Sequence, residues 1–495
     1  MRALSLNNLM AVLKEKIAAN PPGLYVLFYT QMWELFGRFS ITALLILYLT
    51  KSFHIPDSEA FTIYSTFIAL LFGLPILGGY LADRYLGGRR AVLLGGSIMA
   101  IGNTLLVVPV KEVVLVGLAI IAIGSGFFLP SIPPLVSAIY EHDDKKRDAG
   151  FTLYYLGTNV GALLGPILCG FVGQHYGLNY AFLLSTIGMF SGIIVFLRGQ
   201  KHLEQLYRLP TAPFKAGIRF SPHFFIYLGC AFAVPFLLWV IQKDLAGCLL
   251  ILAGIVVMTM VIITLLRAEK KERRHVMMIM LTLLAVIVFE SFLGQGGTTL
   301  NLFIDRLVNR HFFGITLPTS FFYALDPTFM LIMGPILAGI WVRLAKKNKE
   351  PFVMTKFAMA LVVLALGFLV FVFAALSVKI TGKAPLFFVV FAYFLFPIAE
   401  LCIIPISLSL VTRLAPQGLA SVLVGVWMLS NAASGYLTGL ISKLGQVNFS
   451  LNTVLDLNHA AKIYSHLFLL TAIILGATGI VFFLMTPFMS KRFST

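Results

Sequence analysis

Charged side chains lie inside three long apolar stretches of this sequence, and their types indicate ion pairing or proton exchange. Glu34 and Arg38 lie in QMWELFGRFSI (31–41), whereas Glu290 and Glu400 each stand alone among apolar neighbours. An ionisable side chain in a membrane-spanning helix is costly unless it faces a cavity or a partner. Burial disfavours the ionised form of a carboxyl group, and a nearby arginine favours it. The three acids could therefore exchange protons as their surroundings change.

The composition predicts that membrane-spanning helices position these residues. The sequence is 59% hydrophobic and only 12% charged, and its mean hydropathy of +0.94 is far above that of a soluble domain. Apolar runs of about 20 residues can cross a bilayer as helices. Fourteen spans are predicted, at 24–50, 60–82, 90–110, 112–140, 149–174, 180–198, 223–242, 246–267, 275–303, 318–345, 355–378, 385–412, 416–444 and 464–488.

The basic residues predict how these spans are oriented. With fourteen alternating helices, most of the 37 Lys and Arg fall on the side that holds both ends of the chain. That side is expected to be the cytoplasm. Residues 1–22 lack the apolar run of a cleavable signal peptide. The net charge of +17 favours contact with anionic membrane lipids, and its division among short loops argues against nucleic-acid binding.

A weak internal repeat divides the chain into two halves. GLPILGGYLADRYLGGRRA (73–91) has a degraded echo in MGPILAGIWVRLAKK (333–347). Repeats of this kind are typical of membrane proteins built from two six-helix halves. The predicted organisation is a cytoplasmic segment, a first bundle, a linker with an inserted two-helix hairpin, and a second bundle, at 1–22, 23–200, 201–272 and 273–490.

Four motifs in consistent order resemble a known family. GGYLADRYLGGRRAVLLGG (78–96) resembles the loop signature of major facilitator transporters, in the form found in the proton-dependent oligopeptide transporter family. Three more segments resemble that family's fifth, seventh and tenth core helices, namely RDAGFTLYYLGTNVGALLGPILCG (147–170), QGGTTLNLFIDRLVNR (295–310) and ELCIIPISLSLVTRLAP (400–416). The inserted helix pair is similar to that of the bacterial members.

The resemblance implies an all-α membrane protein with the major facilitator fold, in a bacterial inner membrane. It implies a secondary active transporter, not an enzyme, that takes up peptides or peptide-like solutes with protons by alternating access. The proton gradient would supply the energy, without a cofactor or metal, and a monomer would suffice. Asp83 and Arg84, in the loop motif, would gate the cytoplasmic side.

The first helix departs from the family pattern E-x-x-E-R-F-x-Y-Y-x-x-R, whose acids and adjacent arginine are linked to proton coupling. Glu34 is retained, but the first acid is Gln31 and the adjacent arginine is Leu35. The final arginine, which contacts the peptide near its carboxylate, is Thr42 here. The family's fourth-helix lysine is likewise replaced, by Leu129.

A compensating shift suggests an ion pair between the halves. The family's seventh-helix acid falls at Gly294, and the acid appears one turn earlier as Glu290. The first-helix arginine has moved by the same step, from the Thr42 position to Arg38. Arg38 and Glu290 are therefore predicted to form a displaced inter-half salt bridge. The alternative is a local pair with Glu34, which lies on the same helix face, and both hold if Arg38 switches partners.

Further residues are predicted to bind substrate together with Arg38. The resemblance places Glu400 at the peptide's amino terminus and Asn159 at its amides, although Asn159 could instead pack helices. Gln295 is expected to face the cavity, and Trp427 could wall a side-chain pocket, with Asn431 as a weaker polar neighbour.

Other residues leave the chemistry open or argue against alternatives. Asp326 could cap a helix or reach the cavity. The cysteines and histidines show no metal-ligand spacing, and no nucleophile–base group or phosphate loop indicates an enzyme. Two other functions stay open: transport of a non-peptide solute, such as a carboxylate-rich metabolite or metal chelator, and a non-transporting membrane sensor.

Overall fold

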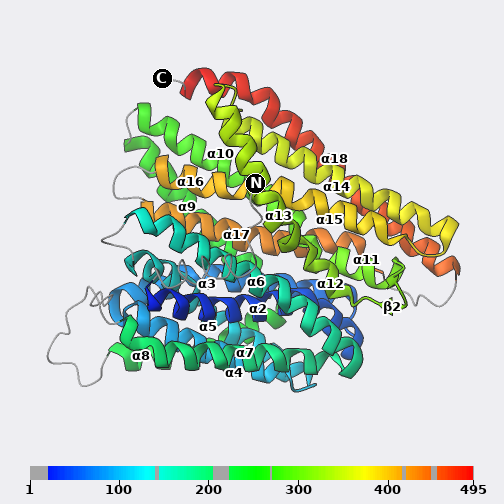
Figure 1. The fold of residues 1–495 in the computed structure, drawn as a ribbon, viewed down its shortest axis with the longest axis horizontal. Helices are drawn as coiled ribbons and strands as arrows, with labels where there is room; N and C mark the ends of the chain where they lie inside the picture. The colour runs from blue at the N-terminus through cyan, green and yellow to red at the C-terminus, as the bar shows by residue number, and fades with distance from the viewer. Residues whose placement is uncertain are drawn as a thin grey trace, which may run out of the picture.

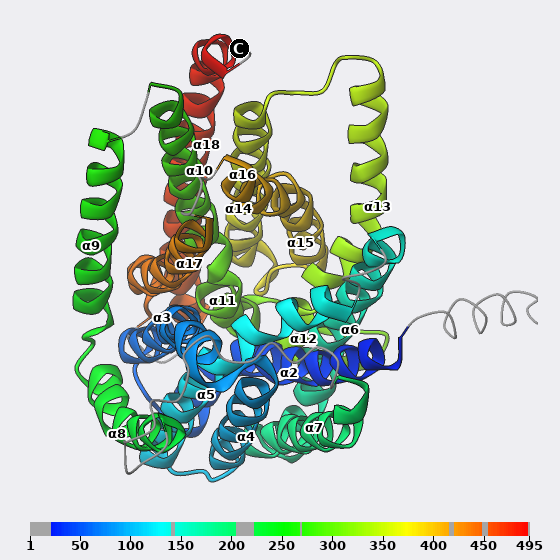
Figure 2. The same cartoon turned by 90° about the vertical axis from the view of Figure 1, so that its left-hand side faces the viewer.

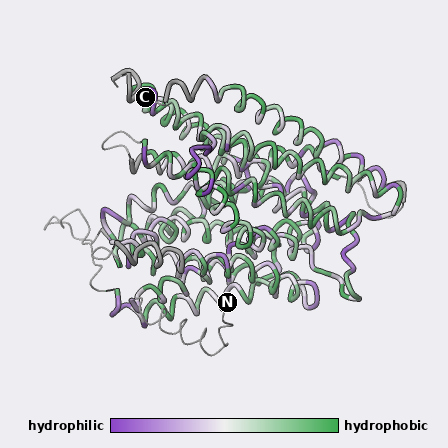
Figure 3. The backbone as a smooth tube through the Cα atoms, turned by 45° about the horizontal axis from the view of Figure 1, so that its top comes forward, coloured by the Kyte–Doolittle hydropathy of each residue, from purple (hydrophilic) through white to green (hydrophobic). Residues whose placement is uncertain are grey.

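The structure, a computed structural model, describes residues 21–139, 144–203, 222–267, 270–414, 420–447 and 454–493. Almost all of the predicted segment 1–22 and much of the linker lie outside these residues. Helices dominate because a bilayer offers no hydrogen bonds to an unpaired backbone. Figure 3 shows apolar residues along the helices, with hydrophilic residues mostly near their ends.

The elements follow the order that the sequence predicts. In the first half they are α2 (Pro22–Leu47), η1 (Tyr48–Ser52), α3 (Asp57–Leu81), η2 (Ala82–Leu86), α4 (Gly88–Leu106), α5 (Lys111–Ile139), α6 (Asp144–Tyr176), α7 (Leu178–Gly199) and η3 (Gln200–His202). Next come α8 (Pro222–Gln242) and α9 (Ala246–Arg267). The second half holds α10 (Lys270–Leu293), η5 (Gly294–Gly297), α11 (Thr299–Leu307), α12 (Thr319–Tyr323), α13 (Leu325–Lys346), α14 (Val353–Thr381), α15 (Leu386–Leu401), α16 (Ile404–Leu414), α17 (Ala420–Ser442), η6 (Lys443–Gly445) and α18 (Val454–Phe493).

These helices pack around two large hydrophobic cores, one below the other in Figure 1. Almost all of the first core comes from α2–α8, and the second comes from α10–α18. In the second core, the rings of Phe303, Phe371 and Phe468 lie with centroids 5.3 to 6.0 Å apart. In the first, Gly78 lies directly on the Gly126 backbone, so α3 and α5 approach closely.

The inserted helices differ in the halves that they contact. α8 packs against α3 and α5 of the first half, whereas α9 packs against α10 and α17 of the second half and also contacts α3 (Figure 2). Much of each helix is exposed, for example Phe232 at 69% and Ile251 at 66%. Such apolar exposure suits contact with lipid chains.

Twelve helices among the described residues are long and apolar enough to span a membrane. Predicted spans 90–110 and 416–444, now α4 and α17, are not among the twelve. α4 carries Arg89 and Arg90 near its start and Asn103 further along, and these polar residues lower its hydropathy. The prediction of fourteen spans is therefore met for twelve.

Three of these spans contain an internal break that the sequence did not predict. Span 275–303 is divided by the glycine-rich turn η5, and span 385–412 is divided between α15 and α16. Pro405, near the start of α16, cannot donate a backbone hydrogen bond to the preceding turn. Span 318–345 is divided between α12 and α13.

A short hairpin makes the fold almost, but not strictly, all-α. β1 (His311–Phe312) and β2 (Ile315–Thr316) pair antiparallel beyond the end of α11. The all-α prediction missed it because strands of two residues leave no periodic signal in the sequence.

Hydrogen bonds between the halves gather at the end that carries this hairpin. The Asn301 amide donates to the Ala43 carbonyl at 2.6 Å, and the Ser320 hydroxyl donates to the Pro166 carbonyl at 2.8 Å. Lys51 Nζ lies 2.7 Å from Asp305 Oδ1. These contacts join α11 and α12 to the first half and close this end of the molecule.

Candidate functional site

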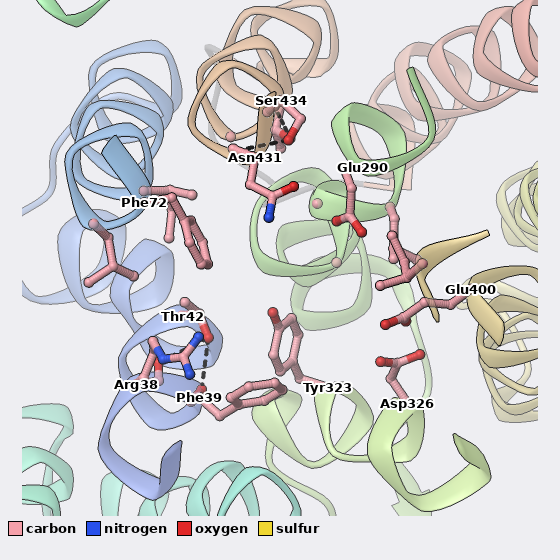
Figure 4. A pocket seen from close by; sticks show the side chains of 18 of the residues that line it. Arg38, Phe39, Thr42, Phe72, Glu290, Tyr323, Asp326, Glu400, Asn431 and Ser434 are labelled. Carbon is pink, nitrogen blue, oxygen red and sulfur yellow. Dashed lines mark hydrogen bonds between the residues drawn. The ribbon is translucent and has the colours of Figure 1, made fainter. Parts of the chain in front are cut away.

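A cavity of about 310 Å³ lies between the two halves (Figure 4). Helical periodicity explains which residues reach it. Glu290 and Leu293 of α10 line the cavity together with Gly294, the first residue of η5, at the spacing of one helix face. In α17, Trp427 and Asn431 are four residues apart, so they also lie on one helix face and line the cavity. Residues of α2, α3, α12, α13, α15 and α16 complete the wall.

Arg38 is held in a local ion pair within α2. Its Nε lies 2.8 Å from Glu34 Oε1, and its Nη2 lies 3.3 Å from Glu34 Oε2. Gln31 Nε2 donates to Glu34 Oε2 at 2.6 Å. The Glu34 side chain is fully buried, whereas the Arg38 side chain is 17% exposed. Both carboxylate oxygens of Glu34 are therefore occupied.

The predicted pair between Arg38 and Glu290 is not formed in this conformation. Both residues line the cavity, but they approach it from different halves, and Arg38 is bonded to Glu34 (Figure 4). The alternative prediction, a pair between Arg38 and Glu34 on the same helix, is the arrangement found in this conformation. A switch of Arg38 to Glu290 in another state stays a prediction.

Three acids converge on the cavity from the second half. Glu290, Asp326 and Glu400 project from α10, α13 and α15, and Asp326 and Glu400 point toward each other (Figure 4). Within the described part of the chain, no ion pair joins any of them to a cation. Asp326, which the sequence left undecided, therefore belongs to the cavity wall. The sequence left this open because Asp326 precedes Pro327 at the start of α13, where an acid can also cap the helix.

Aromatic side chains line much of the remaining wall. The rings of Phe39 and Tyr323 lie 5.9 Å apart across the junction of α2 and α12. Trp427 also lines the cavity, and its Nε1 donates weakly to Ser407 Oγ at 3.4 Å. The cavity thus combines carboxyl groups with aromatic faces.

Two predicted substrate-binding residues lie outside the cavity wall. Asn159 is 6% exposed, and its amide donates to the Tyr155 carbonyl one turn earlier at 2.8 Å. Gln295 is fully buried, and its side-chain atoms have no partner among the described residues. Turn η5 presents the flanking Gly294 and Gly296 to the cavity instead. Neither Asn159 nor Gln295 lines the cavity in this conformation, and their contacts with a substrate stay predictions.

The predicted gate residues lie at the end of α3, in the π-helical turn η2. Both Asp83 and Arg84 are exposed. Arg84 Nη1 donates to the Tyr80 hydroxyl at 2.8 Å, and its guanidinium lies over the Tyr85 ring. Their gating role stays a prediction.

Sequence reasoning missed a buried ion pair at the closed end. Arg306 donates to both oxygens of Asp57, at 2.6 and 2.7 Å, and thereby joins α11 to α3. The Asp57 side chain is only 4% exposed and also accepts the Val447 amide at 3.1 Å. Asp57 follows Pro56 at the start of a helix, where an acid is unremarkable, and this concealed its partner in the other half.

The comparisons agree with this geometry. A profile described as the POT family matches residues 89–483. Dipeptide and tripeptide permeases A of Serratia proteamaculans (strain 568) and Yersinia pestis are 28% and 27% identical, over 94% of this chain and 91% and 92% of theirs.

Solved structures of the same class superpose over nearly the whole chain. A peptide transporter POT in complex with sulfate has a TM-score of 0.81, with 27% identity and 95% of each chain covered. PepTSo2, solved as a tetramer, is 24% identical with a TM-score of 0.82, over 95% of this chain and 99% of its own. The bacterial permease relatives and the apolar spans make this a multi-pass protein of a bacterial inner membrane. All these relatives are transporters, which is consistent with the expectation of a non-enzyme.

Proposed function

Because this chain belongs to the POT family, we propose that it takes up peptides together with protons, by alternating access through the cavity between its halves. One observation carries the proposal. Three acids and one arginine from opposite halves line a single cavity, which is the arrangement that a coupled, two-sided transporter requires. Uptake would consume the proton gradient and no cofactor.

Residues 23–200 and 273–490, the boundaries predicted from the sequence, would act as the moving halves, with the helix pair α8 and α9 between them. Both termini would be cytoplasmic, with α4 and α17 completing fourteen spans. The end that carries the β1–β2 hairpin would then face the periplasm. Because the contacts between the halves close this end, the structure would represent an inward-facing state. A single chain would be the working unit, although PepTSo2 was solved as a tetramer.

Alternating access requires the closed end to open and the other end to close. The Asp57–Arg306 pair joins the halves on the periplasmic side, so it must separate in the outward-facing state. Asp83 and Arg84 would make compensating contacts at the cytoplasmic side. The Asp57–Arg306 pair would therefore close the periplasmic end in one state, and Asp83 and Arg84 would help to close the cytoplasmic end in the other.

Proton coupling would use the partner switch of Arg38. Protonation of Glu34 would weaken its bond to Arg38, because a neutral carboxyl attracts a guanidinium less strongly. Arg38 would then pair with Glu290 and draw the halves together. Glu400, Trp427 and Asn431 would bind the substrate in the occluded cavity, with Asn159 and Gln295 reaching it only after helix movement.

Uptake into proteoliposomes tests this function. Labelled di- and tripeptides are compared with non-peptide carboxylates, with and without an imposed proton gradient. We expect peptide uptake that falls when the gradient is collapsed. Uptake of carboxylates alone would favour the non-peptide alternative, and uptake of neither class would favour the sensor.

A further inference from the structure

We infer that the cavity selects positively charged peptide-like substrates, and that a free substrate carboxylate is not required for binding. The inference rests on the proposed function and specifies its substrate class. It is carried by the unequal numbers of acids and cations around the cavity (Figure 4).

The charges of the wall do not balance. Glu290, Asp326 and Glu400 line the cavity, whereas Arg38 is the one Lys or Arg among its described lining residues. Arg38 is already neutralised by Glu34, at 2.8 Å. When all groups are ionised, three negative charges therefore have no protein cation. A switch of Arg38 to Glu290 would still leave Asp326 and Glu400 uncompensated.

The serine and threonine hydroxyls on the wall are committed to backbone carbonyls. Thr42 Oγ1 donates to the Arg38 carbonyl at 3.1 Å, Ser434 Oγ to the Asn431 carbonyl at 2.9 Å, and Thr438 Oγ1 to the Ser291 carbonyl at 2.9 Å. A substrate carboxylate would thus compete with Glu34 for Arg38. It would also add a negative charge to an acidic cavity.

Acceptors for a cation are available instead. Asp326 Oδ1 and Asn431 Oδ1 are buried and have no hydrogen-bond partner among the described residues. Ammonium groups donate three hydrogen bonds and also bind aromatic faces, which Tyr323 and Trp427 supply here. A substrate with two ammonium groups, such as a lysine-containing dipeptide, would pair with both Asp326 and Glu400.

A matched series of ligands tests this selectivity. Alanyl-lysine, its carboxyl-terminal amide, alanyl-alanine and alanyl-glutamate compete for uptake of a labelled peptide into proteoliposomes. Their binding is measured separately, from the thermal stabilisation of the purified protein. We expect alanyl-lysine and its amide to bind about tenfold more tightly than alanyl-alanine, the effect of one charge-assisted hydrogen bond. Alanyl-glutamate should bind most weakly.

The two readouts separate this inference from the proposed function. If no peptide enters but the lysine amide stabilises the protein most, the transport proposal fails and the selectivity stands. If peptides enter but alanyl-alanine or alanyl-glutamate binds as tightly as the lysine amide, the selectivity is overturned and the transport proposal stands. Loss of binding on amidation would also overturn it.

Variants locate the preference in the cavity. Asp326→Asn removes one acid, and we expect it to reduce the preference for alanyl-lysine about tenfold relative to alanyl-alanine. Thr42→Arg adds a cation to the opposite wall, so alanyl-glutamate should gain. Glu59→Gln is the matched control, because Glu59 is paired with Lys111 on the surface and is 49% exposed. Unchanged ligand ratios in both cavity variants would contradict the inference.

Discussion

At the scale of single residues, the structure shows the ion pair of Glu34 and Arg38, which the sequence offered as the alternative to a pair between Arg38 and Glu290. Spacing of four residues in an apolar helix favoured it, and the structure shows it with Gln31 as a third member. Glu400 also reaches the cavity as expected. Asn159 and Gln295 do not, because family motifs specify a position along a helix but not its rotation or a break beside it.

Glu34→Gln should uncouple transport from the proton gradient. The neutral amide cannot release and recapture a proton, and Arg38 loses its charged partner. We expect gradient-driven uptake to fall at least tenfold while exchange of internal for external peptide is retained. The measurement compares driven uptake and exchange in the same vesicles. A parallel fall in both rates would indicate a structural role only.

At the scale of elements, the order of the helices followed from the sequence, but their breaks did not. Apolar runs predict where a helix crosses the membrane, whereas a break depends on what packs beside it. Turn η5 is an example, because the Tyr64 side chain of α3 lies directly against Gly297. In the sequence alone, the glycines of this turn are equally consistent with close packing of two unbroken helices.

Gly297→Ala should therefore destabilise the protein. The added Cβ would collide with the Tyr64 hydroxyl and lie 3.1 Å from the Thr42 carbonyl oxygen. Overpacking of this kind costs about 1–3 kcal/mol, so thermal unfolding in detergent should begin at a lower temperature. Gly334→Ala in α13 is the control, because its Cβ would meet nothing within 4 Å. Equal unfolding temperatures for the two variants would contradict this account of the turn.

At the scale of the whole molecule, the repeat predicted two halves, and the structure shows two hydrophobic cores with a cavity between them. The state of the molecule was beyond prediction. Which end is closed depends on pairs such as Asp57 and Arg306, whose 249-residue separation leaves no local pattern.

Asp57→Asn should shift the protein away from the closed-periplasm state. Removing one member of a buried ion pair costs about 3–5 kcal/mol, and this cost falls only on the state in which the pair is formed. The labelling rate of a cysteine placed at Thr319, near this end, should therefore rise. The exchanged pair, Asp57→Arg with Arg306→Asp, should restore slow labelling. Fast labelling in the exchanged pair would show that the contact acts through packing and not through charge.

The central claim is that peptide and protons cross together through this cavity, and proton entry during uptake tests it most directly. Purified protein is placed in vesicles that contain a pH-sensitive dye, and peptide is added outside without an imposed gradient. We predict acidification of the vesicle interior on addition of peptide, absent in Glu34→Gln. Peptide entry at the normal rate with no change in internal pH would contradict the account.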